Sequence, residues 1–318
     1  MSPIAERLRH AASDLGPLAR IDEPLGPLTT YRVGGSAALF VSPTSLDELS
    51  KVAVAIARYE LPVLVVGRGS NLLIADRGFA GVAMSLAEWA AGIEVSGVDV
   101  HSGSAVALPV LARRTAAAGL TGFEWAVGVP GSIGGAVRMN AGGHGSDIAA
   151  CIVRAEIFDM HTQRCGWRPA DSLGLRFRGS NLADHEIVLT AHLKLAAGDV
   201  ERSESEIAEI VRWRRENQPG GQNAGSVFVN PIPGQLSAGE LIDRVGLRGF
   251  RIGGAFVSDK HANFIQAGES ATAADVKAVI DEVRERVARE TGFELRSEVR
   301  LVGFDENGAV HPEASSHG

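Results

Sequence analysis

The residues whose types and spacing are most suited to binding a ligand form a glycine-rich run at positions 128–145. Seven of its eighteen residues are glycine, and Arg138 is its only residue with a fixed charge. Glycine lets the backbone approach a ligand closely and adopt positive φ without a Cβ clash. Successive amides in such turns form a concave anion site, so backbone N–H groups would do most of the phosphate binding here. The alternative is a set of tight turns at sheet corners, because glycine is also a leading turn residue.

A second glycine turn follows an apolar strand predicted at residues 63–66. The sequence Gly67-Arg-Gly-Ser-Asn71 then leads into another apolar stretch. It is not the dinucleotide fingerprint G-x-G-x-x-G, because Leu72 occupies the third glycine position, and no Gly-Lys-Ser/Thr follows to make a Walker loop. Two phosphate-type turns that fit neither common motif indicate a different nucleotide cradle.

Together, the two runs resemble the FAD-binding loops of the UDP-N-acetylenolpyruvoylglucosamine reductase family, flavoenzymes of peptidoglycan precursor synthesis. The resemblance spans roughly residues 25–303 and continues, in the order of that family, through four further blocks. These blocks are Thr29-Thr-Tyr-Arg-Val-Gly-Gly35, Asn223-Ala-Gly-Ser-Val-Phe-Val-Asn-Pro231, Lys260-His-Ala-Asn-Phe-Ile265 and Glu298-Val-Arg300. The span from Arg178 to Ser226 is short, which resembles the branch of the family that lacks a tyrosine-bearing insertion.

The resemblance implies an α+β fold with two domains. The first is an FAD-binding domain of the vanillyl-alcohol-oxidase/PCMH type at residues 1–204, with subdomains at about 20–90 and 91–204. The second is an α+β substrate-binding domain at residues 205–303, followed by a polar tail at 304–318. A length of 318 residues agrees with two domains of ordinary size.

The same resemblance implies bound FAD as the cofactor and NADPH as the co-substrate. The positions that match the cofactor contacts of the family lie in the first tyrosine block and in the two glycine runs. They are Tyr31, Gly67, Gly69, Ser70, Asn71, Pro130, Gly131, Ser132, Gly134, Gly135, Asn140, Ala141 and Gly145.

Three residues match catalytic positions of the family. Ser226 matches the serine that protonates the reduced enol ether, and Glu298 matches the catalytic glutamate. Arg178 aligns with an arginine that would bind the enolpyruvyl carboxylate through a bidentate fork, with Arg176 as a rival on the same predicted strand face. From the residues alone, the simpler interpretations are a turn serine, a solvated glutamate and a surface arginine. Ser226 is not a hydrolase nucleophile, because the second glycine of G-x-S-x-G is missing.

Five residues are candidates for the nucleotide-sugar site. Asn230, Arg248, His261 and Arg300 match family positions, and Arg214 is a further candidate for a phosphate contact. A lone histidine such as His261 is a core or surface residue about as often as it is a ligand. The chain also departs from the family at three positions. His144 and Phe177 stand where the family usually has tyrosine, and Val229 stands where it often has lysine or arginine.

Periodicity predicts the elements that must position these residues. Apolar residues at helical spacing predict helices at 4–15, 45–56, 108–118, 201–217, 237–245 and 272–291. Ser45-Leu-Asp-Glu48 and Thr272-Ala-Ala-Asp275 are sequence signatures of helix starts. Strands are expected near 37–41, 63–66, 82–84, 92–103, 151–158 and 186–195, and Gln218-Pro-Gly-Gly221 is a candidate hinge.

Composition limits the partners of the chain. The net charge of −7 and pI near 5.8 argue against nucleic-acid binding. Cys151 and Cys165 have no metal-site spacing, so we predict no metal site and no disulfide. No apolar run approaches the length of a membrane span. We therefore expect a cytoplasmic protein, and the resemblance implies that it binds a UDP-sugar and NADPH; we expect a monomer.

The resemblance implies a reaction in two halves. NADPH reduces the flavin, and UDP-N-acetylglucosamine enolpyruvate is then reduced to UDP-N-acetylmuramate. One alternative is an FAD-dependent oxidase of a sugar or hydroxy acid from the same superfamily. Another is a non-catalytic nucleotide-sugar-binding relative, for which the departures at His144, Phe177 and Val229 are the support.

Overall fold

The computed structural model of the chain describes residues 3–304 and 310–311. The chain forms two compact units that alternate along the sequence. Unit 1 falls within residues 1–21, 39–68 and 82–214, and unit 2 within residues 22–38, 69–81 and 215–318. The division passes through the glycine turn at 67–71, so each unit receives part of that turn.

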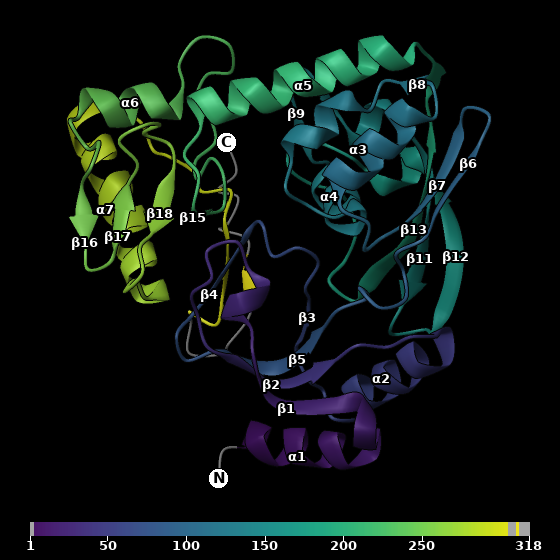
Figure 1. The fold of residues 1–318 in the computed structure, drawn as a ribbon. Helices are drawn as coiled ribbons and strands as arrows, with labels where there is room; N and C mark the ends of the chain where they lie inside the picture. Colours follow the sequence, from purple (N-terminus) through teal and green to yellow (C-terminus); the bar gives the residue numbers. More distant parts are fainter. Residues whose placement is uncertain (1–2, 305–309, 312–318) are drawn as a thin grey trace. The chain divides into compact units, whose positions relative to one another are not determined.

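Unit 1 contains an antiparallel five-stranded sheet with the strand order β12-β11-β13-β7-β6. The helix α4 (Ile133–Met139) packs against β13 and β7, and α3 (Leu108–Ala117) lies beside it (Figure 1). Buried apolar side chains such as Leu111, Phe123 and Ala155 fill the core between helices and sheet. The strands are β6 (Ile93–Ser96), β7 (Asp99–Gly103), β11 (Ile152–Asp159), β12 (Arg164–Pro169) and β13 (Glu186–Lys194).

A second sheet has the strand order β1-β2-β5-β3, and its strands β3 and β5 are parallel. Its members are β1 (Ala19–Pro24), β2 (Ser36–Val41), β3 (Val63–Val65) and β5 (Phe79–Met84). The boundaries between the two units fall inside β1, β2 and β5. Unit 1 also holds α1 (Pro3–Leu15), α2 (Leu46–Arg58), the paired β8 (Leu120–Thr121) and β14 (Ala196–Ala197), and the paired β9 (Gly142–Gly143) and β10 (Ser146–Asp147). The helix α5 (Val200–Asn217) carries the chain from unit 1 into unit 2.

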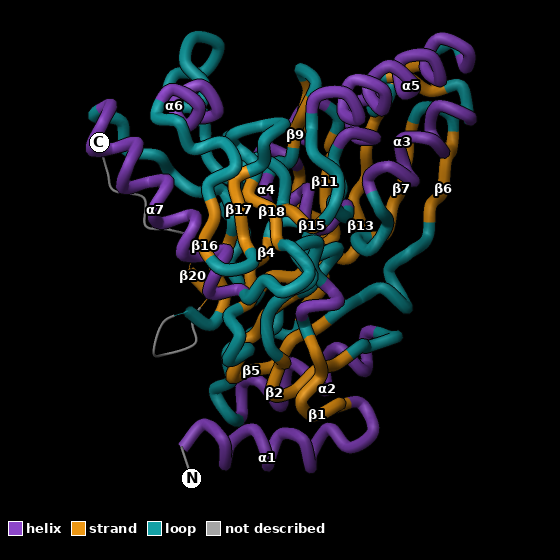
Figure 2. Tube along the Cα trace, turned by 60° about the vertical axis from the view of Figure 1, so that its left-hand side comes forward, coloured by secondary structure: helices purple, strands orange, loops and turns teal. Residues whose placement is uncertain are grey.

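Unit 2 is organised around the long helix α7 (Ala273–Thr291), which packs on a four-stranded antiparallel sheet (Figures 1 and 2). The predicted valine stripe of this helix, from Val276 to Val287, is buried against that sheet. The sheet comprises β15 (Gln222–Asn223), β18 (Ile265–Ala267), β17 (Ala255–Val257) and β16 (Arg251–Ile252), and α6 (Ala238–Arg244) also contacts α7. A three-stranded sheet joins β20 (Val310–His311), β19 (Arg300–Val302) and β4 (Leu72–Ile74).

The observed elements confirm the α+β class and the six predicted helices, whose ends shift by one or two residues. The elements that were not predicted include α4 and β12. The helix α4 has two glycines among its seven residues, and most side chains of β12 are exposed, so neither shows a clear apolar period. In the predicted polar tail, residues 310–311 pair with β19, and residues 305–309 and 312–318 lie outside the described part of the chain.

The start of α7 is bonded to a loop almost two hundred positions earlier in the sequence. The Asp76 carboxylate accepts hydrogen bonds from the amides of Ala273 and Ala274, both at 2.9 Å. The helix therefore has two N-terminal caps, because Thr272 and Asp275 form the predicted capping box as well. Asp76 also carries the favourable negative charge at the positive end of the helix dipole.

We predict that Asp76→Ala lowers the free energy of unfolding by about 1–2 kcal/mol, because two helix-start amides lose their acceptor. Urea unfolding followed by circular dichroism measures this change. The control is Asp281→Ala, since Asp281 makes a surface ion pair with Lys277 on the same helix and should cost at most about 0.5 kcal/mol. Equal stability of the two variants would contradict the cap.

Candidate functional site

The candidate catalytic residues of unit 2 lie on two neighbouring extended segments. Phe228 and Ser297 form an antiparallel bridge. The Glu298 amide donates to the Val227 carbonyl at 2.7 Å, and the Val229 amide donates to the carbonyl of Arg296 at 3.0 Å. Two segments some seventy residues apart are thus paired, and this pairing brings the backbones of Ser226 and Glu298 close together. Ser226 is exposed and Glu298 is partly buried.

Asn71 connects the second glycine turn to the same place. Its side-chain amide donates to the Glu298 carbonyl at 2.8 Å, and its own carbonyl accepts from the Arg300 amide at 3.0 Å. The parallel pairing of β4 with β19 continues from these two bonds. The predicted cofactor residues Ser70 and Asn71 are therefore adjacent to the predicted catalytic strand within one unit.

The turn itself depends on glycine at position 69. Gly69 has φ +58°, and a Cβ added there would lie 2.2 Å from the Leu28 carbonyl oxygen. The Gly69 carbonyl accepts from the Thr30 amide at 3.3 Å, so the turn rests directly on the tyrosine block. The Tyr31 side chain is fully buried in the apolar core of unit 2, and burial raises its pKa. In this structure Tyr31 therefore supports the turn by packing and offers no surface to a ligand.

Asn263, which is not among the predicted site residues, forms hydrogen bonds with the segment that follows Ser226. Its side chain accepts from the Phe228 amide at 2.9 Å and donates to the Phe228 carbonyl at 2.8 Å. Its backbone carbonyl accepts from the Val227 amide at 2.8 Å. Asn263 is 3% exposed, so these bonds satisfy polar groups that water does not reach. The sequence does contain an indication of this role. Asn263 lies between the apolar residues Ala262 and Phe264, and an asparagine buried in such a segment needs hydrogen-bond partners.

The predicted substrate residues of unit 2 have varied surroundings. Asn230 accepts from the Ala238 amide at 3.1 Å, which fixes the start of α6. Arg248 donates hydrogen bonds from its Nε and one terminal nitrogen to the Asp243 carboxylate, at 2.6 and 3.2 Å. The hydrogen bond to Asp243 raises the pKa of Arg248. Both side chains therefore already have structural contacts that a ligand would have to share.

His261 is arranged as a neutral imidazole. Burial, followed by the charge of Arg248, lowers its pKa. Its Nδ1 accepts from the Asn263 amide at 3.3 Å, so the proton of the neutral ring belongs on Nε2. His261 can thus offer an N–H donor, and it packs against the Phe264 ring.

In unit 1, the glycine-rich run forms a short helix with its own cap. The Ser132 hydroxyl accepts from the Gly135 amide, while the amides of Ile133 and Gly134 donate to the carbonyls of Val106 and Ser104 at 2.9 and 2.8 Å. The Ala136 amide donates within the helix to the Ser132 carbonyl. The four amides from Ile133 to Ala136 are thus used by the protein, so amide contacts to a phosphate must come from other residues.

Bare backbone on both sides of Ser132 fits a dinucleotide cofactor. A Cβ at Gly67 would lie 2.5 Å from the Ser132 hydroxyl oxygen, and one at Gly135 would lie 3.5 Å from it. Both glycines are exposed, whereas Ser132 is buried. The two predicted turns therefore meet at Ser132 and leave a strip of backbone open, which is the surface that a phosphate or flavin edge requires. Gly131 and Pro130 lie in the loop that precedes this cap.

The end of the run is a tight hairpin that Asn140 stabilises. Asn140 is buried, accepts from the Ala149 amide at 2.9 Å and donates to Asp147 at 3.0 Å. Ala141 uses both its amide and its carbonyl in backbone bonds. His144 and Gly145 form the two-residue turn between β9 and β10, both with positive φ, as type I′ turns require.

His144, one of the three positions at which the chain departs from the expected family pattern, is packed between two parts of unit 1. A Cβ at Gly128 would come within 2.8 Å of its ring, and the ring meets Trp213 of α5 edge-on at 5.3 Å. Burial and the charge of Arg214 lower the pKa of His144, so it is neutral at pH 7. The partly buried Arg214 thus lies near the glycine-rich run within unit 1. Phe177, the second position that departs from the expected tyrosine, is exposed.

Arg176 and Arg178 occupy a turn, and the strand predicted for them is wrong. The backbones of Arg176 and Gly179 exchange both hydrogen bonds, at 2.9 and 3.0 Å. Arg176 then binds Asn181 and Gly174 of its own loop. Arg178 has φ +55° and donates to the Gly142 carbonyl at 3.2 Å, so it faces the glycine-rich run. Of the two arginines, Arg178 is the one whose side chain reaches the glycine-rich run.

Comparisons with known proteins cover both glycine runs and the C-terminal blocks. A family model described as an FAD binding domain matches residues 37–162, and one described as the C-terminal domain of UDP-N-acetylenolpyruvoylglucosamine reductase matches residues 217–302. The enzyme of that name from Heliobacterium modesticaldum is 42% identical over 290 residues, 91% of each chain, and that from Acidiphilium cryptum is 39% identical over 97% of this chain and 99% of its own.

A solved structure agrees with these sequence relatives. The crystal structure of UDP-N-acetylenolpyruvylglucosamine reductase from Thermus caldophilus matches with a TM-score of 0.76 and 33% identity, over 89% of this chain and 99% of its own. Among the described residues, no helix combines the length and apolar character that crossing a membrane demands.

We predict that Asn263→Ala lowers the free energy of unfolding by about 2–3 kcal/mol, because the Phe228 amide and carbonyl are left unpaired in a buried place. Chemical denaturation measures this loss. Asn230→Ala is the matched control, because Asn230 is exposed and binds one backbone amide, and it should cost about 1 kcal/mol. A smaller loss in Asn263→Ala than in the control would refute the clamp.

Proposed function

Because this chain belongs to the UDP-N-acetylenolpyruvoylglucosamine reductase family, we propose that it reduces UDP-N-acetylglucosamine enolpyruvate to UDP-N-acetylmuramate with electrons from NADPH. It is an FAD-containing oxidoreductase of peptidoglycan precursor synthesis. The observation that carries the assignment of residues is the pairing of the Ser226 and Glu298 segments beside the turn at Asn71.

When bound, FAD supplies the redox chemistry by accepting a hydride from NADPH and passing one to the enolpyruvyl carbon. The residues that would hold it in unit 1 are Gly67, Gly135 and the loop at Pro130–Ser132, where the backbone is bare. In unit 2 they are Gly69, Ser70 and Asn71, whose turn is fixed by the bonds to Thr30 and Arg300. The side chain of Asn140 serves the shape of its loop.

Ser226 would protonate C2 of the substrate. Gly225, before it, has φ +80°, and Val227, after it, is fixed by Asn263 and Glu298, so the serine stands at the end of a rigid segment. Its side chain is exposed, which leaves the hydroxyl free to approach a ligand. A neutral hydroxyl is a weak acid, and it suits a strongly basic carbon with carbanion character.

Arg178 and Glu298 would stabilise the negative charge that develops toward the carboxylate. The Arg178 guanidinium can bind the enolpyruvyl carboxylate as a fork, which also orients the double bond. Glu298, on the segment paired with that of Ser226, would act on the same developing charge. Asn230, Arg248, His261, Arg300 and Arg214 are the proposed contacts to the nucleotide sugar.

Further parts of the proposal concern organisation and location. We propose an FAD-binding domain at 1–204 and a substrate-binding domain at 205–303, which the family matches at 37–162 and 217–302 support. Two free cysteines and a nucleotide-sugar substrate support action in the cytoplasm. We propose a monomer, and light scattering after gel filtration tests this state.

The visible spectrum of the purified protein tests the reaction. A flavin spectrum that bleaches with NADPH without oxygen, and returns when the enolpyruvyl nucleotide sugar is added, is the expected result. Return of the spectrum with air alone, and no response to the nucleotide sugar, would instead support an oxidase. A folded protein that shows no flavin spectrum after FAD is supplied would refute the proposal.

We predict that Ser226→Ala separates the two half-reactions. Bleaching by NADPH should keep its rate, because the hydroxyl takes no part in it. Return of the flavin spectrum with substrate should slow about 10²- to 10⁴-fold, the usual contribution of a positioned proton donor. Stopped-flow absorbance measures both rates, with Ser172→Ala, at an exposed serine outside the predicted site residues, as the control. Equal slowing of both half-reactions would remove Ser226 from the proton-transfer role.

We predict that Arg178→Lys reduces kcat/KM for the enolpyruvyl substrate about 10- to 100-fold, equivalent to a charge-assisted hydrogen bond of about 1.5–3 kcal/mol. Lysine keeps the charge but cannot form the fork. Arg176→Lys should change kcat/KM less than about threefold, since Arg176 binds its own loop. Steady-state kinetics decide between them, and the reverse order would assign the carboxylate to Arg176.

A further inference from the structure

A second group of chemically active side chains lies on the five-stranded sheet of unit 1. Asp159 is the last residue of β11, His161 lies in the turn toward β12, and His185 immediately precedes β13. Asp159 pairs with Glu186 across the sheet, so the end of one strand meets the start of the other. None of the three residues belongs to the candidate catalytic or cofactor sets.

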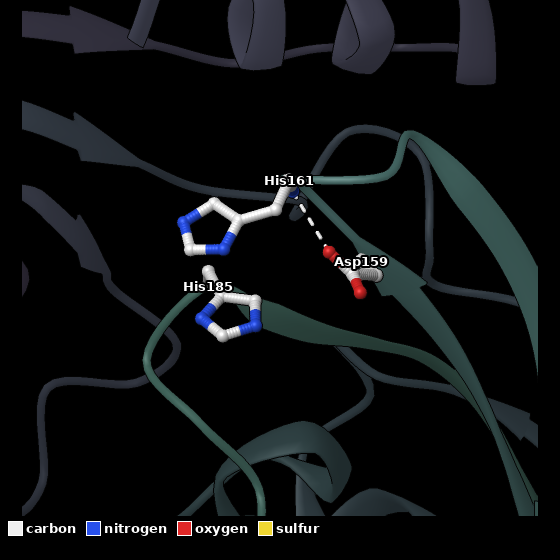
Figure 3. A group of neighbouring side chains, drawn as sticks. All are labelled: Asp159, His161 and His185. Carbon is white, nitrogen blue, oxygen red and sulfur yellow. Dashed lines mark hydrogen bonds between the residues drawn. The ribbon is translucent and has the colours of Figure 1, made fainter. Parts of the chain in front are cut away.

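The three side chains gather their donor atoms in one place. One ligand atom from each, a ring nitrogen or a carboxylate oxygen, lies within 4.8 Å of the other two. Figure 3 shows that each imidazole turns a nitrogen toward the side where the Asp159 carboxylate lies. Among the residues that the structure describes, this is the one group of three or more His, Cys, Asp or Glu side chains arranged in this way.

Backbone contacts fix the carboxylate and both segments. Asp159 accepts from the amides of His161 at 2.8 Å and Thr162 at 3.1 Å, and the Met160 amide donates to the His185 carbonyl at 3.0 Å. The Asp159 carboxylate is therefore held in place beside two imidazoles.

We propose that Asp159, His161 and His185 bind a divalent transition-metal ion of the zinc class. Two imidazole nitrogens and one carboxylate oxygen are a donor set that such ions favour, with water completing the coordination. The ion would connect the β11–β12 turn to the residue before β13. It would thus stabilise the end of the sheet where β11 finishes and β13 begins, and it would have no part in the proposed reduction.

Binding requires a small rearrangement of the rings. The imidazoles are now stacked, with centroids 3.8 Å apart and planes 15° from parallel. Ligand bonds of about 2.0–2.2 Å need donor atoms roughly 3–3.5 Å apart and lone pairs that converge on the ion. His161 is exposed and sits in a turn, and rotation about its ring torsion is soft, so it can tilt out of the stack.

A second histidine pair on the same sheet provides an internal contrast. His101 and His192 face each other across β7 and β13, and they are also stacked, with centroids 4.3 Å apart. Their neighbouring carboxylate, Asp99, is hydrogen-bonded directly to His192 Nε2 at 2.7 Å. That carboxylate occupies Nε2 of His192, and the donor atoms of the three side chains do not gather as those of Asp159, His161 and His185 do. The pair thus has the same residue types without a convergent donor set.

The experiment titrates Zn²⁺ into the untagged, FAD-loaded protein after treatment with a chelator, with detection by isothermal calorimetry. We expect one ion per chain with a Kd below about 0.1 mM. His161→Gln and His185→Gln should each weaken this binding at least about tenfold, because metal sites lose 10–100-fold affinity even when only outer contacts are removed. His101→Gln should bind as the unaltered protein does, and background sites are the same in all variants.

Thermal unfolding gives a second measure that does not depend on enzyme activity. Zn²⁺ should raise the melting temperature of the unaltered protein and of His101→Gln, but not that of His161→Gln, because a ligand stabilises the state that binds it. Melting in chelator shows whether each variant is folded. Absence of binding up to 1 mM Zn²⁺, or equal loss in His101→Gln and His161→Gln, would overturn the proposal.

Discussion

The segment from Arg296 to Val302 shares its backbone hydrogen bonds between two other parts of the chain, and the candidate site of unit 2 depends on that sharing. On one side the segment binds residues 227–229, and on the other it binds Asn71 and then β4. Backbone polar groups that leave water must find partners, so neither side can shift alone without leaving donors and acceptors unpaired. The result is that Ser226, Glu298 and the turn at Gly69–Asn71 are positioned by one continuous set of bonds.

The same requirement explains three polar side chains that bind backbone groups, of which Asn263 and Asn140 are buried and Asp76 is exposed. Asn263 and Asp76 both bind backbone groups of segments far away in the sequence, and Asn140 does so within its own loop. Each fixes an irregular stretch where no helix or strand could satisfy the backbone. Irregular backbone suits a ligand site, because its groups can be aimed individually, and buried side-chain amides make it rigid. Rigid segments of this kind are what proton transfer to one particular carbon requires.

The helices could be predicted from the sequence because burial of one face imposes a period that a single segment displays. The stripe from Val276 to Val287 is an example, and it is buried as expected. The surroundings of Arg178 could not be predicted in this way, since a turn with φ +55° is set by the bonds between Arg176 and Gly179 and by Gly142. Asn263 was missed for a related reason, because its partners at Phe228 lie thirty-five positions away.

The glycine-rich runs indicate the correct family, but close approach of a ligand explains only some of their glycines. Glycines serve two purposes, and the structure separates them by what a Cβ would meet. At Gly69, Gly134 and Gly142 it would collide with the protein itself, so these positions are glycine because other segments pack against them. A Cβ at Gly145 would meet open space, and one at Gly135 would make only an ordinary contact with the Ser132 hydroxyl, so close packing does not explain glycine at either position. Gly145 has positive φ, which the hairpin turn requires, whereas Gly135 is helical and exposed. An exposed helical glycine costs about 1 kcal/mol relative to alanine, so the absence of a side chain at position 135 is best explained by a ligand that comes close to the backbone.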